Sequence, residues 1–222
     1  MINKIFNYIL ILYILFFLYI NRGLSIDTHL KLLNILESNY PLEITFEQNY
    51  KGEKTLGWMV IDGKGMARTE FAPPNNNIIV ADGKWIMFYD PEIERTTYIP
   101  LENGILEIML KPKSLTKNKV FEVKEEIKNN KIIFKIIFNL NKTIQNIVIY
   151  FNKETNKLIG WKLYESDNDY IEVKVLTSKK FDFSNNQNFF RLPNLDKKSE
   201  IIYLGPYKKR KVNKFLGSGR LN

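Results

Sequence analysis

Short apolar runs alternate with turn-forming residues throughout residues 58–99, and this rhythm limits the fold more than any other feature of the chain. The breaks come at intervals of about ten residues, the spacing of strands and tight turns in an antiparallel meander. Asp82-Gly83 is the strongest hairpin signal, because both central residues of a type I′ turn need positive φ angles. The stretch predicts consecutive antiparallel strands separated at Gly63-Lys64-Gly65, Pro73-Pro74-Asn75, Asp82-Gly83 and Asp90-Pro91.

The rest of the chain continues this β pattern. Its 222 residues include 15 Phe and 12 Tyr, and aromatic residues favour strands over helices. Residues 42–50 alternate between apolar and polar side chains, with Leu42, Ile44 and Phe46 on one face. Further strands are expected at residues 54–61, 120–127, 131–138, 143–151, 157–165 and 169–177, with a last short strand near 189–192.

Two helices are expected among these strands. Residues 29–38 have an amphipathic pattern with Leu30, Leu33 and Leu36 along one side. Residues 101–110 are rich in large apolar side chains. A short helix of this kind suits two positions: a lid over the mouth of the sheet, or a helix packed permanently on the core.

The N-terminal segment has the features of an export signal. An apolar run at residues 5–20 follows Lys4 and precedes Gly23-Leu24-Ser25. This pattern predicts a signal peptide over residues 1–25 that is cleaved near Ser25. The alternative is an uncleaved membrane anchor, and both interpretations export the domain that follows.

The net charge of +9 is concentrated at the two ends of the chain. Residues 26–196, the expected domain, balance their acids and bases and predict no nucleic-acid surface. Residues 197–222 form a basic tail that carries eight Lys and Arg residues and one acid. The tail is either a solvated, disordered extension or a tether to anionic lipid headgroups or an acidic partner, at up to about 1 kcal/mol per base.

The residues that catalysis and metal binding require are scarce. The chain has no Cys and one His, so it lacks disulfides, thiol nucleophiles and a lipid-anchored N-terminal cysteine. Carboxylate pairs such as Glu92/Glu94 and Glu125/Glu126 fall in turns or on solvent-facing positions. We therefore expect a protein that is not an enzyme and that uses no cofactor, with no catalytic or metal site.

One motif resembles a known family. The segment IIVADGKWIMFYDPEIERTTYIP, with Arg68, Phe71 and Pro74 before it, is similar to the periplasmic outer-membrane lipoprotein carrier (LolA-like) family. The similarity extends over about residues 28–196. The positions that match as they stand are Arg68, Pro74, Val80, Asp82, Gly83, Lys84, Tyr89, Asp90, Pro91 and Glu94.

The resemblance implies a mainly β fold, an incomplete and unclosed antiparallel β-barrel with a short helical lid. In that fold, the apolar residues beyond a minimal core would line a cavity for the acyl chains of lipoproteins. Ordinary core packing is the alternative for each of them. The candidates are Phe46, Trp58, Phe71, Trp85, Phe88, Phe134, Phe138 and Trp161, with Leu106, Met109 and Leu110 on the lid side.

The chain departs from the family pattern at one position. The family usually has an arginine before this motif that holds the lid shut, and here that position falls on Gly63-Lys64. Arg68 matches a different arginine of the motif. Closure of the lid in this chain must therefore rest on another contact, or be weaker.

The expected function is that of a periplasmic chaperone for triacylated lipoproteins. By the resemblance, a monomer would receive cargo from an inner-membrane ABC-type transporter and pass it to an outer-membrane receptor or to the outer membrane itself. Two alternatives stay open: an envelope sensor or structural module of the same fold that holds no lipid, and a membrane-retained accessory protein.

Overall fold

A computed structural model describes residues 28–102, 105–116, 121–140, 143–164, 169–182, 189–192 and 200–203. The expected signal peptide and the basic tail beyond residue 203 lie outside these residues. None of the described helices is long and apolar enough to cross a membrane.

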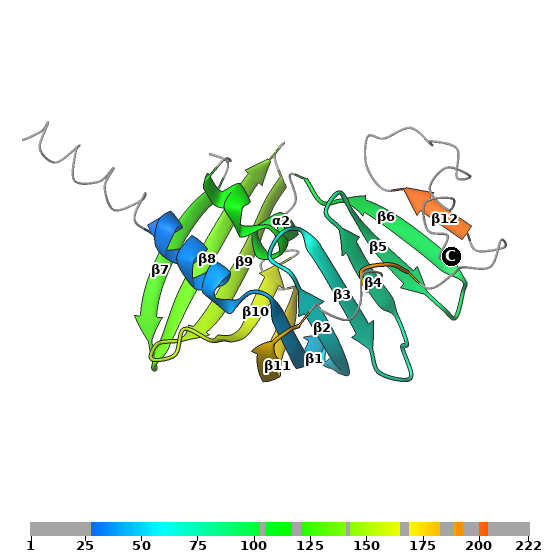
Figure 1. Cartoon of the computed structure of the whole chain (residues 1–222), viewed down its shortest axis with the longest axis horizontal. Helices are drawn as coiled ribbons and strands as arrows, with labels where there is room; N and C mark the ends of the chain where they lie inside the picture. The colour runs from blue at the N-terminus through cyan, green and yellow to red at the C-terminus, as the bar shows by residue number, and fades with distance from the viewer. Residues whose placement is uncertain are drawn as a thin grey trace, which may run out of the picture.

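The described strands form a single sheet that does not close on itself (Figure 1). Eleven strands are antiparallel to their neighbours, and β12 pairs in parallel with β6 at one edge. The opposite edge is β7, so the predicted unclosed antiparallel fold is confirmed. The strand order is β12 (Glu200–Tyr203), β6 (Arg95–Pro100), β5 (Trp85–Asp90), β4 (Ile78–Asp82), β3 (Met66–Phe71), β2 (Glu53–Ile61), β1 (Leu42–Tyr50), β11 (Tyr170–Lys180), β10 (Leu158–Tyr164), β9 (Thr143–Asn152), β8 (Lys131–Leu140) and β7 (Phe121–Lys128).

The meander predicted between residues 58 and 99 is confirmed as β2 to β6, but the turn at Asp82-Gly83 is not type I′. Of these two residues only Gly83 has a positive φ, 91°. Asp82 instead accepts backbone hydrogen bonds on Oδ1 from the N–H groups of Lys84 and Trp85, at 2.9 and 2.8 Å. A side-chain cap therefore stabilises this hairpin in place of a second left-handed residue.

Alternation along the strands gives the sheet one strongly apolar face, which we call the inner face. It carries Leu42, Ile44 and Phe46 of β1, all at most 4% exposed, as the sequence predicted. A helix over residues 28–39 lies against this face in front of β7 to β10 (Figure 1). The second helix, α2 (Leu106–Leu110), continues into a 3₁₀ turn, η1 (Pro112–Thr116).

The first helix buries a different stripe from the one predicted. Leu33 and Leu36 are buried, together with Leu32 and Ile35, whereas Leu30 is 47% exposed. At about 100° per residue, Leu30 lies about 200° around the helix from Leu32. The prediction that Leu30 belongs to the buried side of the helix was wrong, because Leu32 and Ile35 form that side together with Leu33 and Leu36.

Polar contacts fix both ends of the first helix to the sheet. Near its start, Lys31 forms an ion pair with Glu125 of β7. At its end, the Lys180 ammonium of β11 donates hydrogen bonds to the carbonyl oxygens of Ser38 and Tyr40, at 2.6 and 2.8 Å. A cation at these carbonyls also complements the negative end of the helix dipole.

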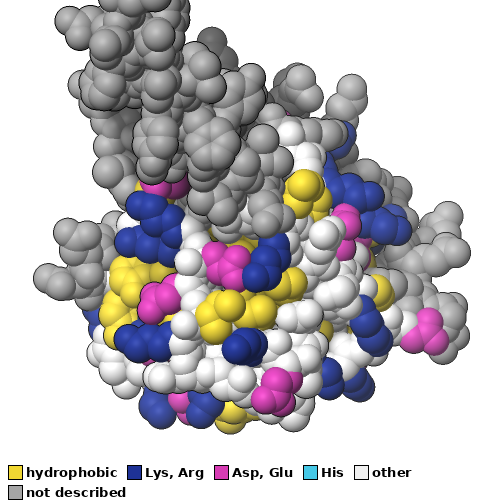
Figure 2. Space-filling model, turned by 90° about the vertical axis from the view of Figure 1, so that its left-hand side faces the viewer, with side chains coloured by type: hydrophobic (Ala, Val, Ile, Leu, Met, Phe, Trp, Pro, Cys, Tyr) yellow, Lys and Arg dark blue, Asp and Glu magenta, His cyan; other side chains and the backbone are white. Residues whose placement is uncertain are grey.

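The β7 edge is protected by charge. Exposed charged side chains alternate with the apolar residues of this strand or flank them. They are Glu122, Lys124, Glu126 and Lys128. The view onto this side of the molecule shows Lys and Arg side chains interspersed with Asp and Glu around small hydrophobic areas (Figure 2). Charged side chains along an edge strand disfavour pairing with the strand of another molecule.

The strand predicted at residues 189–192 is wrong. Phe190 and Leu192 pack on a cluster of Val80, Met87 and Tyr98 on the face opposite the inner face, which we call the outer face. No strand ladder holds this described segment.

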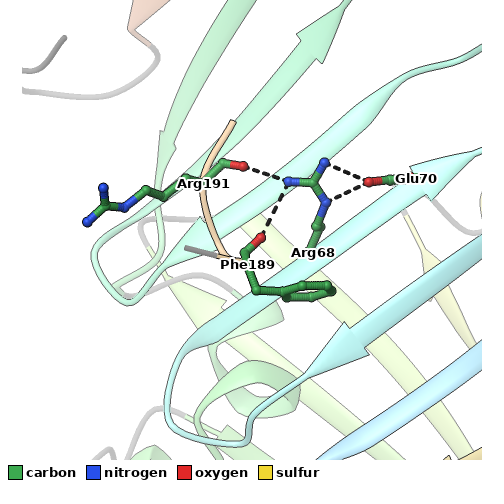
Figure 3. A network of polar contacts seen from close by, with 4 residues as sticks. All are labelled: Arg68, Glu70, Phe189 and Arg191. Atoms are coloured by element: carbon green, nitrogen blue, oxygen red, sulfur yellow. Dashed lines mark hydrogen bonds and ion pairs between the residues drawn. The ribbon is translucent and has the colours of Figure 1, made fainter. Parts of the chain in front are cut away.

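The Arg68 side chain binds the segment instead (Figure 3). Its Nη1 donates to the carbonyl oxygens of Arg191 and Phe189, at 2.6 and 3.4 Å, while Nε and Nη2 both contact Glu70 Oε1 at 2.6 Å. The last strand lies further on, at β12, within the segment expected to be tail.

Gly160 occupies a position that has no room for a side chain. It lies at a register shift between β10 and β9. A Cβ atom here would be 2.2 Å from the carbonyl oxygen of Val173 on β11. The close approach of these two backbones therefore requires glycine.

We predict that Gly160→Ala lowers the free energy of unfolding by about 1–3 kcal/mol, because the strands must separate to accept the methyl group. Gly52→Asn is the control for the loss of glycine's backbone freedom: Gly52 has φ +89° and open space around it, so a substitution there costs backbone strain without a steric clash. Urea unfolding followed by circular dichroism measures both variants. Equal losses would contradict the steric explanation.

Candidate functional site

Six of the eight predicted lining residues lie on the inner face. Phe46 is opposite Gly57 and, across it, Phe71, and the two phenyl rings meet edge-on at 5.7 Å. A Cβ atom on Gly57 would lie 2.4 Å from the Phe46 ring, so this glycine makes room for the aromatic pair. Strand register places four more on the same face: Phe88, Phe134, Phe138 and Trp161.

The two other candidates, Trp58 and Trp85, point to the outer face. Trp58 donates its indole N–H to Glu43 at 3.0 Å and packs against Phe189. Trp85 packs against Tyr98 in the outer cluster. Both are one position out of step with the inner-face residues of their strands, and successive residues of a strand face opposite sides. They therefore do not share a surface with Phe46.

The inner face is covered most completely over β7 to β10. Phe134 is 0% exposed, and Phe138 and Trp161 are also buried. They belong to one hydrophobic cluster with the buried side of the first helix and with Ile108 and Met109 of α2. In this conformation they are core residues, and a ligand would reach them only if a helix moved.

The inner face is less completely covered over β2 to β6. Met59, Phe71 and Ile79 are partly buried at the margin of the core, and Ile99 of β6 is 40% exposed. On α2, Met109 is buried, whereas Leu106 and Leu110 are partly buried and pack against the same core. The apolar groups that a ligand could contact with little rearrangement are therefore Met59, Phe71, Ile79, Phe88, Ile99, Leu106 and Leu110.

A buried hydrogen bond holds α2 against the rest of the protein. The Tyr40 hydroxyl donates to the carbonyl oxygen of Met109 at 2.6 Å. The Tyr40 ring lies against Gly63, where a Cβ atom would be 2.6 Å away. Burial raises the pKa of the Tyr40 hydroxyl, and the charge of Asp62 raises it further. The hydroxyl therefore stays protonated as a donor at neutral pH.

The hydrogen bond between Tyr40 and Met109 was not predicted from the sequence. The missing family arginine would fall on Gly63-Lys64, the turn against which Tyr40 packs. No local pattern links Tyr40 to Met109, which is 69 residues away.

The chemistry of the inner face is that of apolar contact. Thr69 is a buried polar side chain within it, and Glu107 of the covering helix α2 is a buried carboxylate. Among the described residues, no group of three or more His, Cys, Asp and Glu side chains is placed to hold a metal ion. An open antiparallel sheet with two helices on its apolar face identifies a structural class of protein. It does not identify a chemical reaction.

The family model described as outer membrane lipoprotein carrier protein LolA matches residues 40–190. Because this match spans more than half of the chain, the protein belongs to the LolA family.

Two groups of relatives are outer-membrane lipoprotein carrier proteins. The protein from Legionella pneumophila (strain Corby) is 25% identical over 158 residues, which cover 69% of this chain and 77% of the relative. The protein from Histophilus somni (strain 2336) is 27% identical over 73 residues, covering 33% of this chain and 36% of the relative.

Among solved structures, the chain is similar to an uncharacterized conserved protein from Thermus thermophilus, with a TM-score of 0.48 and 14% identity over 78% of this chain and 98% of the other. It is also similar to a LolA superfamily protein from Nitrosomonas europaea, with a TM-score of 0.41 and 6% identity over 73% of this chain and 96% of the other.

We predict that Tyr40→Phe destabilises the protein by about 1–3 kcal/mol, because it leaves the buried Met109 carbonyl without this donor. Hydrogen exchange should quicken in α2 more than in the first helix. Tyr89→Phe, on the outer face by its register opposite Ile78, is the control and should change neither quantity. Unchanged exchange in α2 would show that Tyr40 does not hold it.

The raised pKa of Tyr40 also predicts a loss of stability in alkali. A group whose pKa is higher in the folded state contributes its full stability below the unfolded value, about 10 for Tyr, and loses it as the pH rises further. The difference in unfolding free energy between wild type and Tyr40→Phe should therefore shrink as the pH rises above about 10. Urea unfolding of both proteins across this range measures it, and a constant difference would argue against the buried donor.

Proposed function

We propose that the protein carries lipoproteins across the periplasm by holding their acyl chains against the inner face. The observation that carries the proposal is one continuous apolar face, covered by two helices, in a member of the LolA family. Binding and release would proceed without covalent chemistry or a cofactor.

The burial of the inner face explains how binding can be reversible. An acyl chain gains about 0.8 kcal/mol for each buried CH₂ group, so several chains in an empty cavity would bind too tightly for a carrier. Here Phe134, Ile136 and Ile149 are already at 0% exposure under the protein's own side chains. Acyl chains that reach them replace existing apolar contacts, and only the difference appears as affinity.

We propose that the acyl chains first contact the less covered part of the inner face. Phe71, Ile79 and Phe88 would receive the chain ends on the sheet side, with Leu106 and Leu110 of α2 opposite. Movement of α2 would then make room toward Phe46 and expose Met109 of α2 to the chains. Phe134, Phe138 and Trp161 would take part only after further displacement.

The cellular setting follows from the same proposal. Residues 1–25 would direct export, and the mature protein would act as a periplasmic monomer. Cargo would be triacylated lipoprotein, supplied by an inner-membrane ABC-type transporter and delivered to an outer-membrane receptor or to the outer membrane. The names of the relatives support the lipoprotein cargo.

The second candidate function is an envelope sensor or structural module that holds no lipid. The observation that favours it is the complete burial of Phe134 and its neighbours, which fits a permanently closed core. The two functions differ in one measurable property, the uptake of an acyl ligand.

We predict that Phe71→Asp weakens binding of a fluorescent fatty acid and of a triacylated lipopeptide at least about tenfold. A buried carboxylate costs more than the roughly 1.4 kcal/mol that a tenfold change represents. Leu56→Asp is the matched control, because Leu56 is 53% exposed and lies on the outer face of β2, the strand that pairs with the strand of Phe71.

Native mass spectrometry of protein purified from the periplasm provides the second readout. The carrier should retain acylated cargo. Wild-type protein that is empty, and that binds neither probe, would overturn the carrier proposal in favour of the module.

A further inference from the structure

The outer face of β8 to β11 carries a cluster of tyrosines and lysines that the proposed carrier function does not use. Strand register brings them together, since Tyr164 is opposite Tyr170, and Tyr150 is opposite Gly160. We call this cluster the Tyr-Lys patch; it consists of Tyr150, Tyr164, Tyr170, Lys131, Lys135, Lys162 and Lys174.

The side chains of the patch contact one another. The Lys162 ammonium lies 4.4 Å from the centre of the Tyr170 ring, and the Lys131 ammonium lies 5.9 Å from that of Tyr150. The rings of Tyr164 and Tyr170 are 5.3 Å apart. Cation–π contacts of this kind keep aromatic rings and ammonium groups side by side at a surface.

Apolar side chains lie between these polar tips. Ile133, Ile137 and Val148 are half-buried on the same face, although neither hydrophobic core of the protein includes them. Gly160 has no side chain to cover the flank of Tyr150. The patch therefore has apolar bodies below and hydroxyl or ammonium groups at its surface.

The charge of the patch is predominantly positive. Within the patch, four lysines accompany one carboxylate, Glu172, which pairs with Lys162 at 3.3 Å. Beside the patch on the same face, Glu47 lies opposite Lys174, and Glu122 and Glu126 lie next to Lys124 on β7, so the surrounding surface is mixed in charge. Lys131, Lys135 and Lys174 are exposed. A partner of complementary charge must present anionic groups.

The composition of the patch indicates that this partner is a membrane surface. Tyr and Lys side chains suit the boundary between a bilayer and water, because their apolar bodies lie near acyl chains while their polar ends reach the headgroups. The helices lie on the opposite face of the sheet, so they leave the face that carries the patch uncovered (Figure 1).

We propose that the Tyr-Lys patch is a docking surface for anionic membrane lipids. The contact is weak and reversible, and it presents the protein to a bilayer with the outer face of β8 to β11 against the headgroups. It does not depend on binding of acyl chains to the inner face.

Co-sedimentation of the full chain with vesicles tests the proposal, using phosphatidylcholine with and without phosphatidylglycerol. The triple variant Lys131→Gln, Lys135→Gln, Lys174→Gln should lower partitioning onto anionic vesicles at least about tenfold. The control variant Lys64→Gln, Lys84→Gln, Lys113→Gln removes the same charge from exposed positions elsewhere and should lower it far less.

A tyrosine variant separates the patch from general charge effects. Tyr150→Ser with Tyr170→Ser should also weaken vesicle binding, and the loss should persist when added salt screens the lysines. Thermal unfolding confirms that each variant is folded, and binding of the fluorescent fatty acid should be unchanged in all of them.

Three results would overturn the proposal. Equal losses in the two lysine variants would assign binding to net charge. Unchanged partitioning of the patch variants would assign it to another part of the chain. Patch-dependent binding to an acidic polypeptide, with none to anionic vesicles, would make the partner a protein.

Discussion

Packing of the first helix against the inner face is the contact on which the rest of the structure depends. An unclosed sheet cannot bury its apolar face against itself, so another element must cover it. Leu32, Leu33, Ile35 and Leu36 do this over β7 to β10, and the contacts of Lys31 and Lys180 hold the helix in place. The outer face needs less cover, because most of its side chains are polar or amphipathic.

The two helices differ in how they are held. The first is held by polar contacts with β7 near its start and with β11 at its end. α2 has five residues and lacks a side-chain hydrogen bond at its N-cap, and the contacts that hold it include apolar packing and the Tyr40 hydroxyl. Local opening starts where the stabilising contacts are fewest. In the proposed carrier function, α2 is therefore the element that we expect to exchange places with cargo.

Local signals in the sequence predicted most of the strands. Turn residues such as Asp82-Gly83 and Asp90-Pro91 mark strand ends, and strands 42–50 and 131–138 follow from alternation and apolar content. The predictions failed where contacts between residues far apart in the sequence determine the structure. Trp58 and Trp85 belong to the outer face because of strand register, and residues 189–192 pack as an irregular segment because Arg68 binds their carbonyls. The Tyr40–Met109 bond joins residues that only the folded chain brings together.

The parallel direction of β12 has a geometric consequence for the end of the chain. Tyr203 lies beside Tyr98, so β12 and β6 finish at the same rim of the sheet. From that rim β6 leads through Leu101 toward α2. The direction of this single four-residue strand therefore brings Tyr203, the last described residue, to the rim from which the chain continues to α2.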